Sequence, residues 1–181
     1  MVLRKAFLTL ILLMSAPAAA VPVFAEEASL PGDASSLRES HGDWTVACAL
    51  TAASDGKKVR ICAFTQEQFT KDTHQRALAI ELRPDNGGAK GTLALPFGLS
   101  LDKGVSYQID EAASGAPQRF RTCYPQGCLV DLAFDDKVTA SLKTAKALKI
   151  KAIAEGGQDI SFSVSLNGFG SAYDRALALL K

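Results

Sequence analysis

Side chains that commonly carry out catalysis are scarce in this sequence. Its 181 residues include only two histidines, His41 and His74, and neither belongs to a Gly-x-Ser-x-Gly or His-Glu-x-x-His motif. The glycine pairs at 87–88 and 156–157 lack the following helix and lysine of a phosphate-binding loop. We therefore predict no catalytic, cofactor-binding or metal-ligating residue, and we do not expect an enzyme. The acidic residues Asp102, Asp110 and Glu111 leave a glycosidase-like carboxylate pair as an alternative.

An excess of basic charge is also missing. Removing Arg4 and Lys5, which lie in a predicted signal peptide, from the 20 basic side chains leaves 18, against 19 acidic ones. Nucleic-acid-binding proteins usually show a marked basic excess, so we predict no nucleic-acid partner. No stretch after the first 25 residues is long and apolar enough to span a bilayer, so we predict no transmembrane span in the mature chain.

The first 25 residues have the three parts of a secretory signal peptide. Arg4 and Lys5 give a positive start, residues 6–14 are apolar, and Val23-Phe24-Ala25 is a small-x-small cleavage site. The apolar run is too short to cross a membrane, although an uncleaved anchor is an alternative. We predict that residues 1–25 are removed and that the mature protein is periplasmic. Outer-membrane association and secretion are the other locations that export allows.

The remaining chain is predicted to form a flexible arm and one domain. Residues 26–40 are rich in Ala, Ser, Pro, Gly and acidic residues and show little periodicity, which is typical of an arm. From residue 41 onward, short segments alternate apolar and polar side chains, most clearly at 160–166. Helices are expected from Asp135 and from Ser171. The pattern predicts a mostly β domain over residues 41–181, a β-sandwich with two short helices.

Four cysteines behind an export signal favour disulfide bonds. Three pairings are possible. Local pairing is favoured, because Cys48 and Cys62 lie on neighbouring predicted strands, while Cys123 and Cys128 flank a Pro-Gln-Gly turn. In the chain-entropy model, bonds that close loops of these lengths stabilise by about 3 and about 2 kcal/mol.

Two other uses of the cysteines compete with disulfides. A zinc site would use all four, but thirteen residues separate Cys48 from Cys62, whereas zinc ligands are commonly paired at shorter spacing. A thiol-redox role would use Cys123 and Cys128, but four residues intervene where oxidoreductases have two. A structural staple is the favoured interpretation.

Four lysines form the one local bias of charge: Lys143, Lys146, Lys149 and Lys151. A weak contact with an anionic surface is one interpretation. The favoured one is the solvated face of a short helix and strand, where lysines also discourage edge-to-edge aggregation.

Three aromatic residues, Trp44, Phe97 and Phe169, could be taken for a ligand platform. Single aromatics in such strands and turns are more often packed in the core or at strand ends. For Trp44 we predict full burial.

Several sequence landmarks occur together in order along the chain. They are Gly42-Asp43-Trp44-Thr45-Val46-x-Cys48, Cys62 with Gln66, Leu95-Pro96-Phe97-Gly98-Leu99-x-Leu101-x-x-Gly104-Val105, Cys123-Tyr124-Pro125-Gln126-Gly127-Cys128, and Ser165-Leu166-Asn167-Gly168-Phe169. In this set the chain resembles the invasion-associated locus B family of exported Gram-negative proteins. The resemblance covers about residues 42–173 and leaves residues 26–40 outside it.

The resemblance implies an immunoglobulin-like β-sandwich, an envelope location and no established enzymatic activity. We therefore expect a non-enzymatic envelope protein that binds an envelope or host protein or glycan, linked by family to host-cell invasion and virulence. The alternative is a periplasmic enzyme or a thiol-redox protein that uses Cys123 and Cys128.

Overall fold

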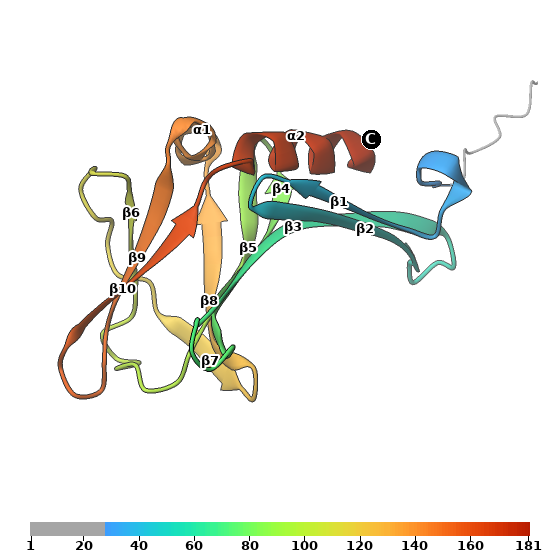
Figure 1. Cartoon of the computed structure of the whole chain (residues 1–181). Helices are drawn as coiled ribbons and strands as arrows, with labels where there is room; N and C mark the ends of the chain where they lie inside the picture. Colours follow the sequence, from blue (N-terminus) through green and yellow to red (C-terminus); the bar gives the residue numbers. More distant parts are fainter. Residues whose placement is uncertain (1–27) are drawn as a thin grey trace, which may run out of the picture.

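The computed structural model describes residues 28–181, so the predicted signal peptide lies outside the described residues. These residues form ten strands, two α-helices and a 3-10 helix (Figure 1). The first elements are η1 (Pro31–Asp33), β1 (Ser36–His41), β2 (Trp44–Ala52), β3 (Lys58–Phe69), β4 (Arg76–Asp85), β5 (Gly88–Leu95) and β6 (Ser106–Ile109). The others are β7 (Phe120–Tyr124), β8 (Gly127–Phe134), α1 (Asp136–Thr144), β9 (Ala147–Ile153), β10 (Asp159–Ser165) and α2 (Phe169–Leu180).

The strands form two antiparallel sheets. The large sheet has seven strands in the order β1-β2-β3-β4-β5-β8-β7, and the small sheet has three in the order β10-β9-β6. Helix α2 lies along the β1–β4 end of the large sheet, and the small sheet lies on the other side of β8 (Figure 1). The mostly β class with two helices and two disulfides is thus as predicted.

Local sequence explains the clearest elements. Ile160, Phe162 and Val164 of β10 alternate with serines, and this period of two is that of a strand with one face toward the core. Helix α1 begins after Asp135, whose carboxylate accepts a hydrogen bond from the amide of Val138 at 2.7 Å. An acidic cap of this kind satisfies an amide that has no partner within the helix.

A cluster of aromatic rings joins α2 to the large sheet. Trp44 is 1% exposed, as predicted, and its ring lies 5.4 Å from Phe64 and 5.3 Å from Phe169, centre to centre. Tyr173 adds a fourth ring on α2 and donates a hydrogen bond to the Gly88 carbonyl at 3.2 Å. Phe97, in contrast, is 61% exposed and follows the end of β5 by two residues, so of the two expected placements, core or strand end, it is not in the core.

The predicted arm is partly wrong. Residues 36–40 belong to β1, which pairs along its whole length with β2, and Leu30 is only 2% exposed. β1 escapes detection because Leu37 is its one apolar residue, so its alternation is carried by polar side chains. Helix α2 also begins at Phe169, two residues before Ser171.

Candidate functional site on the open face of the large sheet

One face of the large sheet is packed into the core, and the other face is not covered by any described element. Even-numbered residues of β2, β3 and β4, from Trp44 to Leu82, point mainly into the core, because successive strand residues face opposite sides. The other face, here called the open face, has no covering helix or strand among residues 28–181. Its central positions are small side chains: Ala47, Ala49, Ala63, Thr65, Ala79, Thr92 and Ala94.

Arginines stand around this floor of small residues. They are Arg38, Arg76, Arg83 and Arg121. Three of them pair with carboxylates: Arg76 with Glu67 at 3.3 Å, Arg83 with Glu81 at 2.8 Å, and Arg121 with Asp131 at 3.3 Å. No carboxylate of residues 28–181 lies within ion-pair distance of Arg38. The guanidinium of Arg38 is therefore available to an anionic group from outside.

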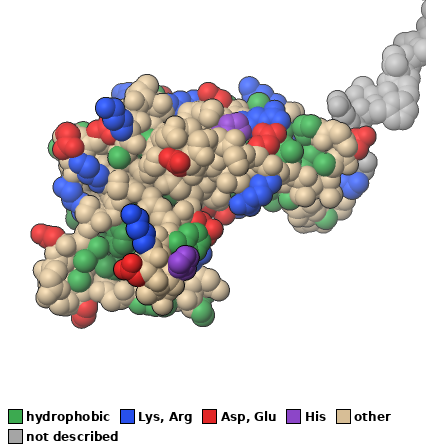
Figure 2. All heavy atoms as spheres, in the orientation of Figure 1, with side chains coloured by type: hydrophobic (Ala, Val, Ile, Leu, Met, Phe, Trp, Pro, Cys, Tyr) green, Lys and Arg blue, Asp and Glu red, His purple; other side chains and the backbone are tan. Residues whose placement is uncertain are grey.

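Two adjoining hollows follow the open face, and together we call them the groove. One measures about 430 Å³ and extends from Arg38 on β1 to Arg121 on β7; the other, of about 500 Å³, lies over the β1–β4 end. Arg38 and Glu81 line both. The space-filling outline is indented below the β2–β3 end of the molecule (Figure 2). The groove is a shallow surface, broad enough for an extended partner.

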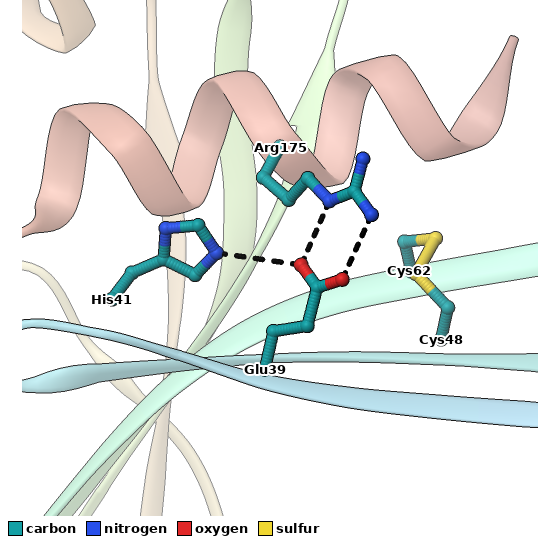
Figure 3. The surroundings of a disulfide bond; sticks show 5 residues. All are labelled: Glu39, His41, Cys48, Cys62 and Arg175. Carbon is teal, nitrogen blue, oxygen red and sulfur yellow. Dashed lines mark hydrogen bonds and ion pairs between the residues drawn. A yellow bond between two sulfur atoms is a disulfide. The ribbon is translucent and has the colours of Figure 1, made fainter. Parts of the chain in front are cut away.

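An ion pair holds the strand that carries Arg38. Glu39, the next residue of β1, points to the other side and meets Arg175 of α2 (Figure 3). The two hydrogen bonds from Arg175 Nε and Nη2 to the carboxylate measure 2.7 and 2.8 Å, and His41 Nε2 lies 3.5 Å from the same carboxylate. These contacts, chiefly the hydrogen bonds from Arg175, lower the pKa of Glu39. A bidentate arginine–carboxylate pair is directional, so it fixes β1 against α2.

Both disulfides join residues that face each other across neighbouring strands. Cys48 of β2 is bonded to Cys62 of β3, and their Cα atoms are 4.1 Å apart. This bond lies in the core beside Glu39 and Arg175 (Figure 3). Cys123 of β7 is bonded to Cys128 of β8 across the hairpin turn, with Cα atoms 3.9 Å apart. The two disulfides thus link β2 to β3 near one edge of the large sheet and β7 to β8 at the other edge.

Several family landmarks meet at one buried junction. Trp44 Nε1 and Gln66 Nε2 both donate hydrogen bonds to the Ser165 carbonyl at 2.9 Å, and Gln66 Oε1 accepts one from the Ser165 amide at 3.0 Å. The side-chain amide of Gln66, which is only 5% exposed, thus pairs with the backbone of Ser165 as a neighbouring strand would, although Ser165 lies 99 positions away. These landmarks hold the end of β10 beside β2 and β3, so their role in the structure is positional.

The same junction requires two glycines. Gly42 has a φ of 56°, and a Cβ atom there would lie 2.6 Å from the Asn167 carbonyl oxygen. Gly168, with a φ of 86°, packs its Cα against the His41 carbonyl. A larger residue at either position would be strained and would push the β1–β2 turn away from the start of α2.

The remaining sequence candidates have separate structural partners. Asp110 accepts hydrogen bonds from the amides of Lys146 and Ala147, Glu111 pairs with Lys149 at 2.7 Å, and Asp102 pairs with Lys103 at 3.4 Å. His74 lies in an exposed turn. The structure does not bring these acids and histidines together into one site.

The four lysines are also partly engaged. Lys143 pairs with Asp174 at 2.7 Å and its ammonium lies 4.1 Å from the centre of the Tyr173 ring, while Lys149 pairs with Glu111. Lys151 is exposed on β9. Within residues 28–181, two of the four lysines thus have a carboxylate partner.

Sequence reasoning missed the open face. Its signal is present as small residues at alternate positions, Ala47 and Ala49 of β2 and Ala63 of β3, with arginines on the flanking strands. The signal is weak because short side chains and single arginines also occur in ordinary solvated strands.

The described residues hold neither a membrane helix nor a metal cluster. No helix within 28–181 is long and apolar enough to cross a membrane. The same residues contain no group of three or more His, Cys, Asp or Glu that could hold a metal ion.

Fold and site together define a disulfide-stapled, two-sheet β protein whose large sheet leaves one face free. The sequence model of the Invasion associated locus B (IalB) protein family matches residues 44–177. The chain belongs to this family.

Named relatives support this assignment. An invasion protein B homolog of Brucella abortus (strain 2308) is 45% identical over 156 residues, covering 85% of this chain and 87% of the relative. Invasion protein B of Bartonella bacilliformis is 34% identical over 168 residues, covering 91% and 86%. The crystal structure of invasion associated protein b from Bartonella henselae matches with a TM-score of 0.69 at 32% identity, over 79% of this chain and 96% of that one.

Proposed function

We propose that the protein is an exported, non-enzymatic binding protein of the bacterial envelope that holds a protein partner on the open face. The carrying observation is the groove: among residues 28–181 this sheet face has no covering element, its floor is made of small side chains, and Arg38 has no carboxylate partner. Small residues let a partner's backbone approach closely, and arginine is enriched where partners are held.

The partner's chemistry follows from the charges of the groove. Three of its arginines already face carboxylates, whereas Arg38 pairs with no carboxylate of residues 28–181. A carboxylate of the partner placed over Arg38 would accept two hydrogen bonds from its guanidinium, and each arginine of the groove would then face a carboxylate. We therefore propose an extended protein segment that carries an acidic side chain; a glycan is the other class that the test can reveal.

The names of the relatives support a role at the boundary with a host cell. The Brucella and Bartonella proteins are named for invasion. We extend this link to the present chain as part of the proposal. Within the two-sheet class, an immunoglobulin-like arrangement stays a prediction.

Photo-cross-linking in living cells tests the binding face. A benzoylphenylalanine placed at Ala63, in the floor of the groove, should capture a specific protein. The matched control is the same residue at Ala178, which is exposed on α2. Capture at position 63 and not at 178 supports the proposal. Equal capture at both, or none at 63 in cells that express the protein in its native compartment, contradicts it, and a captured glycan would replace the protein partner.

Location is tested by protease accessibility on intact cells, with a known periplasmic protein as the control. The four cysteines, all paired, suit an oxidising compartment outside the cytoplasm. Survival of both proteins until the outer membrane is opened is expected for a periplasmic protein. Cleavage of this protein alone would place it at the surface. The mass of the mature chain checks the predicted removal of residues 1–25.

The thiol-redox alternative makes a different prediction. Cys123 is exposed at the β7–β8 hairpin while Cys128 is buried, so a redox partner could reach only one sulfur directly. A Cys123→Ser, Cys128→Ser double variant that retains partner capture at position 63 would separate binding from redox chemistry. Loss of an oxidoreductase activity in the same variant would favour the alternative.

A further inference from the structure

The outermost strand, β1, leaves the backbone groups along one edge of the large sheet unpaired. The Leu50 amide donates a hydrogen bond to the Ser35 carbonyl at 3.0 Å, so the odd-numbered residues at this end of the ladder bond to β2. In an antiparallel ladder, the residues between them turn their N–H and C=O groups the other way. Ser36, Arg38 and Ser40 therefore present these groups at the edge, and no backbone group of the described residues pairs with them there.

The other edges of the two sheets are blunted. The side chains of Gln66 and Gln68 bond to carbonyls on the free side of β10, and the Gly115 amide bonds to the outward Tyr107 carbonyl of β6 at 2.9 Å. The ladder of β7 is interrupted by a register shift. Bulges, prolines, lysines and covering groups commonly keep edge strands from pairing. β1 has six residues in continuous register with β2 and contains no proline or lysine, so its edge can accept another strand.

The side chains of β1 restrict the strand that fits. Glu39 points toward α2, where Arg175 holds its carboxylate, so Arg38 lies on the opposite, open face (Figure 3). The residue directly opposite Arg38 on an added strand would place its side chain on this same face. An acidic residue there would give Arg38 the carboxylate that no described residue provides. A second copy fits less well, because pairing through the same three residues places one Arg38 opposite the other.

We propose that an extended segment of a protein partner pairs with β1 as an eighth, antiparallel strand of the large sheet, with an aspartate or glutamate opposite Arg38. Backbone hydrogen bonds to Ser36, Arg38 and Ser40 supply affinity, and the carboxylate fixes the register. The groove begins at Arg38, so the chain beyond the paired segment lies over the open face. The assignment of this strand to the open-face partner rests on the function proposed above; the free edge does not.

Amide hydrogen exchange of the labelled mature protein tests the edge with a synthetic strand. The probe is acetyl-Lys-Thr-Val-Glu-Val-Thr-Lys-amide, N-methylated at both valines so that only one of its edges can pair. Saturating peptide should slow exchange of the Ser36, Arg38 and Ser40 amides about 10-fold or more, because these amides gain acceptors. The Leu37 and Glu39 amides, already bonded to β2, should change little. Unchanged exchange at the three even-numbered residues would overturn the proposal.

Two control peptides make this exchange experiment specific. Moving the N-methyl groups to the glutamate and both threonines removes the donors that face β1, so this peptide should not bind. Replacing the glutamate by glutamine should weaken binding about 2- to 5-fold, the effect of one exposed ion pair. Arg38→Ala should abolish this difference. Equal binding of the two peptides to the unaltered protein would refute the selection of an acidic residue.

A pair of proline variants separates edge pairing from folding. Ser40→Pro removes an outward N–H and places a ring against the added strand, while every bond between β1 and β2 is kept. Ser161→Pro is the matched control, at an exposed serine on the free edge of β10 whose amide also points away from the neighbouring strand. Peptide binding and capture at position 63 should be lost in Ser40→Pro and kept in Ser161→Pro.

The two assays distinguish failure of the edge from failure of the open-face partner. Peptide protection of β1 without capture at position 63 would support the edge site and contradict the proposed function. Capture at position 63 that persists in Ser40→Pro, without peptide protection, would contradict strand addition and leave the proposed function standing. Protection of the Ser36, Arg38 and Ser40 amides that rises with protein concentration alone would identify a second copy as the occupant and overturn the proposal.

Discussion

The closed and open faces of the large sheet are built from the same strands and differ in almost every physical property. Neighbouring residues such as Phe64 and Thr65 belong to opposite faces, since strand side chains alternate. The closed face meets α2 and the small sheet through large apolar rings, whereas the open face has short side chains and arginines. The difference indicates that the closed face supplies most of the stability and that residues of the open face can change at little cost to folding.

The strongest test of this contrast is the replacement of Trp44. Trp44→Ala removes a fully buried indole, its contacts with Phe64 and Phe169, and its hydrogen bond to Ser165, and should cost about 3–5 kcal/mol of unfolding free energy. Thr45→Ala, one residue away on the open face, should change it by less than about 0.5 kcal/mol. Chemical denaturation measures both. A loss below about 1 kcal/mol in Trp44→Ala would contradict the assignment of stability to the closed face.

The next largest effect concerns the disulfides. Cys48→Ser with Cys62→Ser opens a loop between residues 14 positions apart and should cost about 3 kcal/mol, because the unfolded chain gains freedom. Cys123→Ser with Cys128→Ser, where the separation is 5, should cost about 2 kcal/mol. The first pair also leaves two hydroxyls in the core, which adds to its cost. Denaturant unfolding of the two double variants should show this order, and the reverse order would contradict it.

The third prediction tests the binding role proposed for Arg38 on the open face. Arg38→Ala should change the unfolding free energy by less than about 0.5 kcal/mol, because the side chain is exposed and outside every ion pair of the described residues. The same variant should reduce partner capture at position 63, since it removes the free guanidinium. Lys58→Ala also removes one positive charge, from an exposed strand position outside the groove, and should leave capture unchanged. Equal losses in both variants would mean that net charge, and not the groove, controls binding.

The smallest effect is the pH dependence of the Glu39–Arg175 pair. The pKa of Glu39 is lower in the folded protein than in the unfolded chain, chiefly because of the hydrogen bonds from Arg175. Its stabilising contribution is therefore complete above the ordinary pKa of a glutamate and is lost as the pH falls through the lowered folded value. Glu39→Gln should melt at a lower temperature than the unaltered protein at neutral pH, and this difference should shrink in acid. A difference that is constant with pH would contradict the assignment.

Local chemistry made much of the fold predictable. The alternation of Ile160, Phe162 and Val164, the acidic cap at Asp135 and the close spacing of Cys123 and Cys128 each report on a few neighbouring residues. The pairing of β5 with β8 joins residues such as Leu93 and Val130, and no short pattern encodes it. β1 was missed because an ion pair to Arg175, 136 positions away, fixes a strand with one apolar residue.

The candidate site was less accessible to sequence reasoning than the fold. Arg38, Glu81 and Thr92 lie on three different strands, and only the completed sheet places them beside one groove. Sequence patterns report burial along one strand, whereas this site depends on contacts between strands.

The junction around Ser165 also sets the order in which the molecule can be completed during synthesis. Trp44 of β2 finds its hydrogen-bond acceptor, the Ser165 carbonyl, 121 positions later in the sequence, and the ring of Phe169 that packs against it follows shortly after. A nascent chain that lacks this segment has β2 and β3 but not the residues that pack over their apolar face. The core around Trp44 can therefore close only after the segment that holds Ser165 and Phe169 has been made.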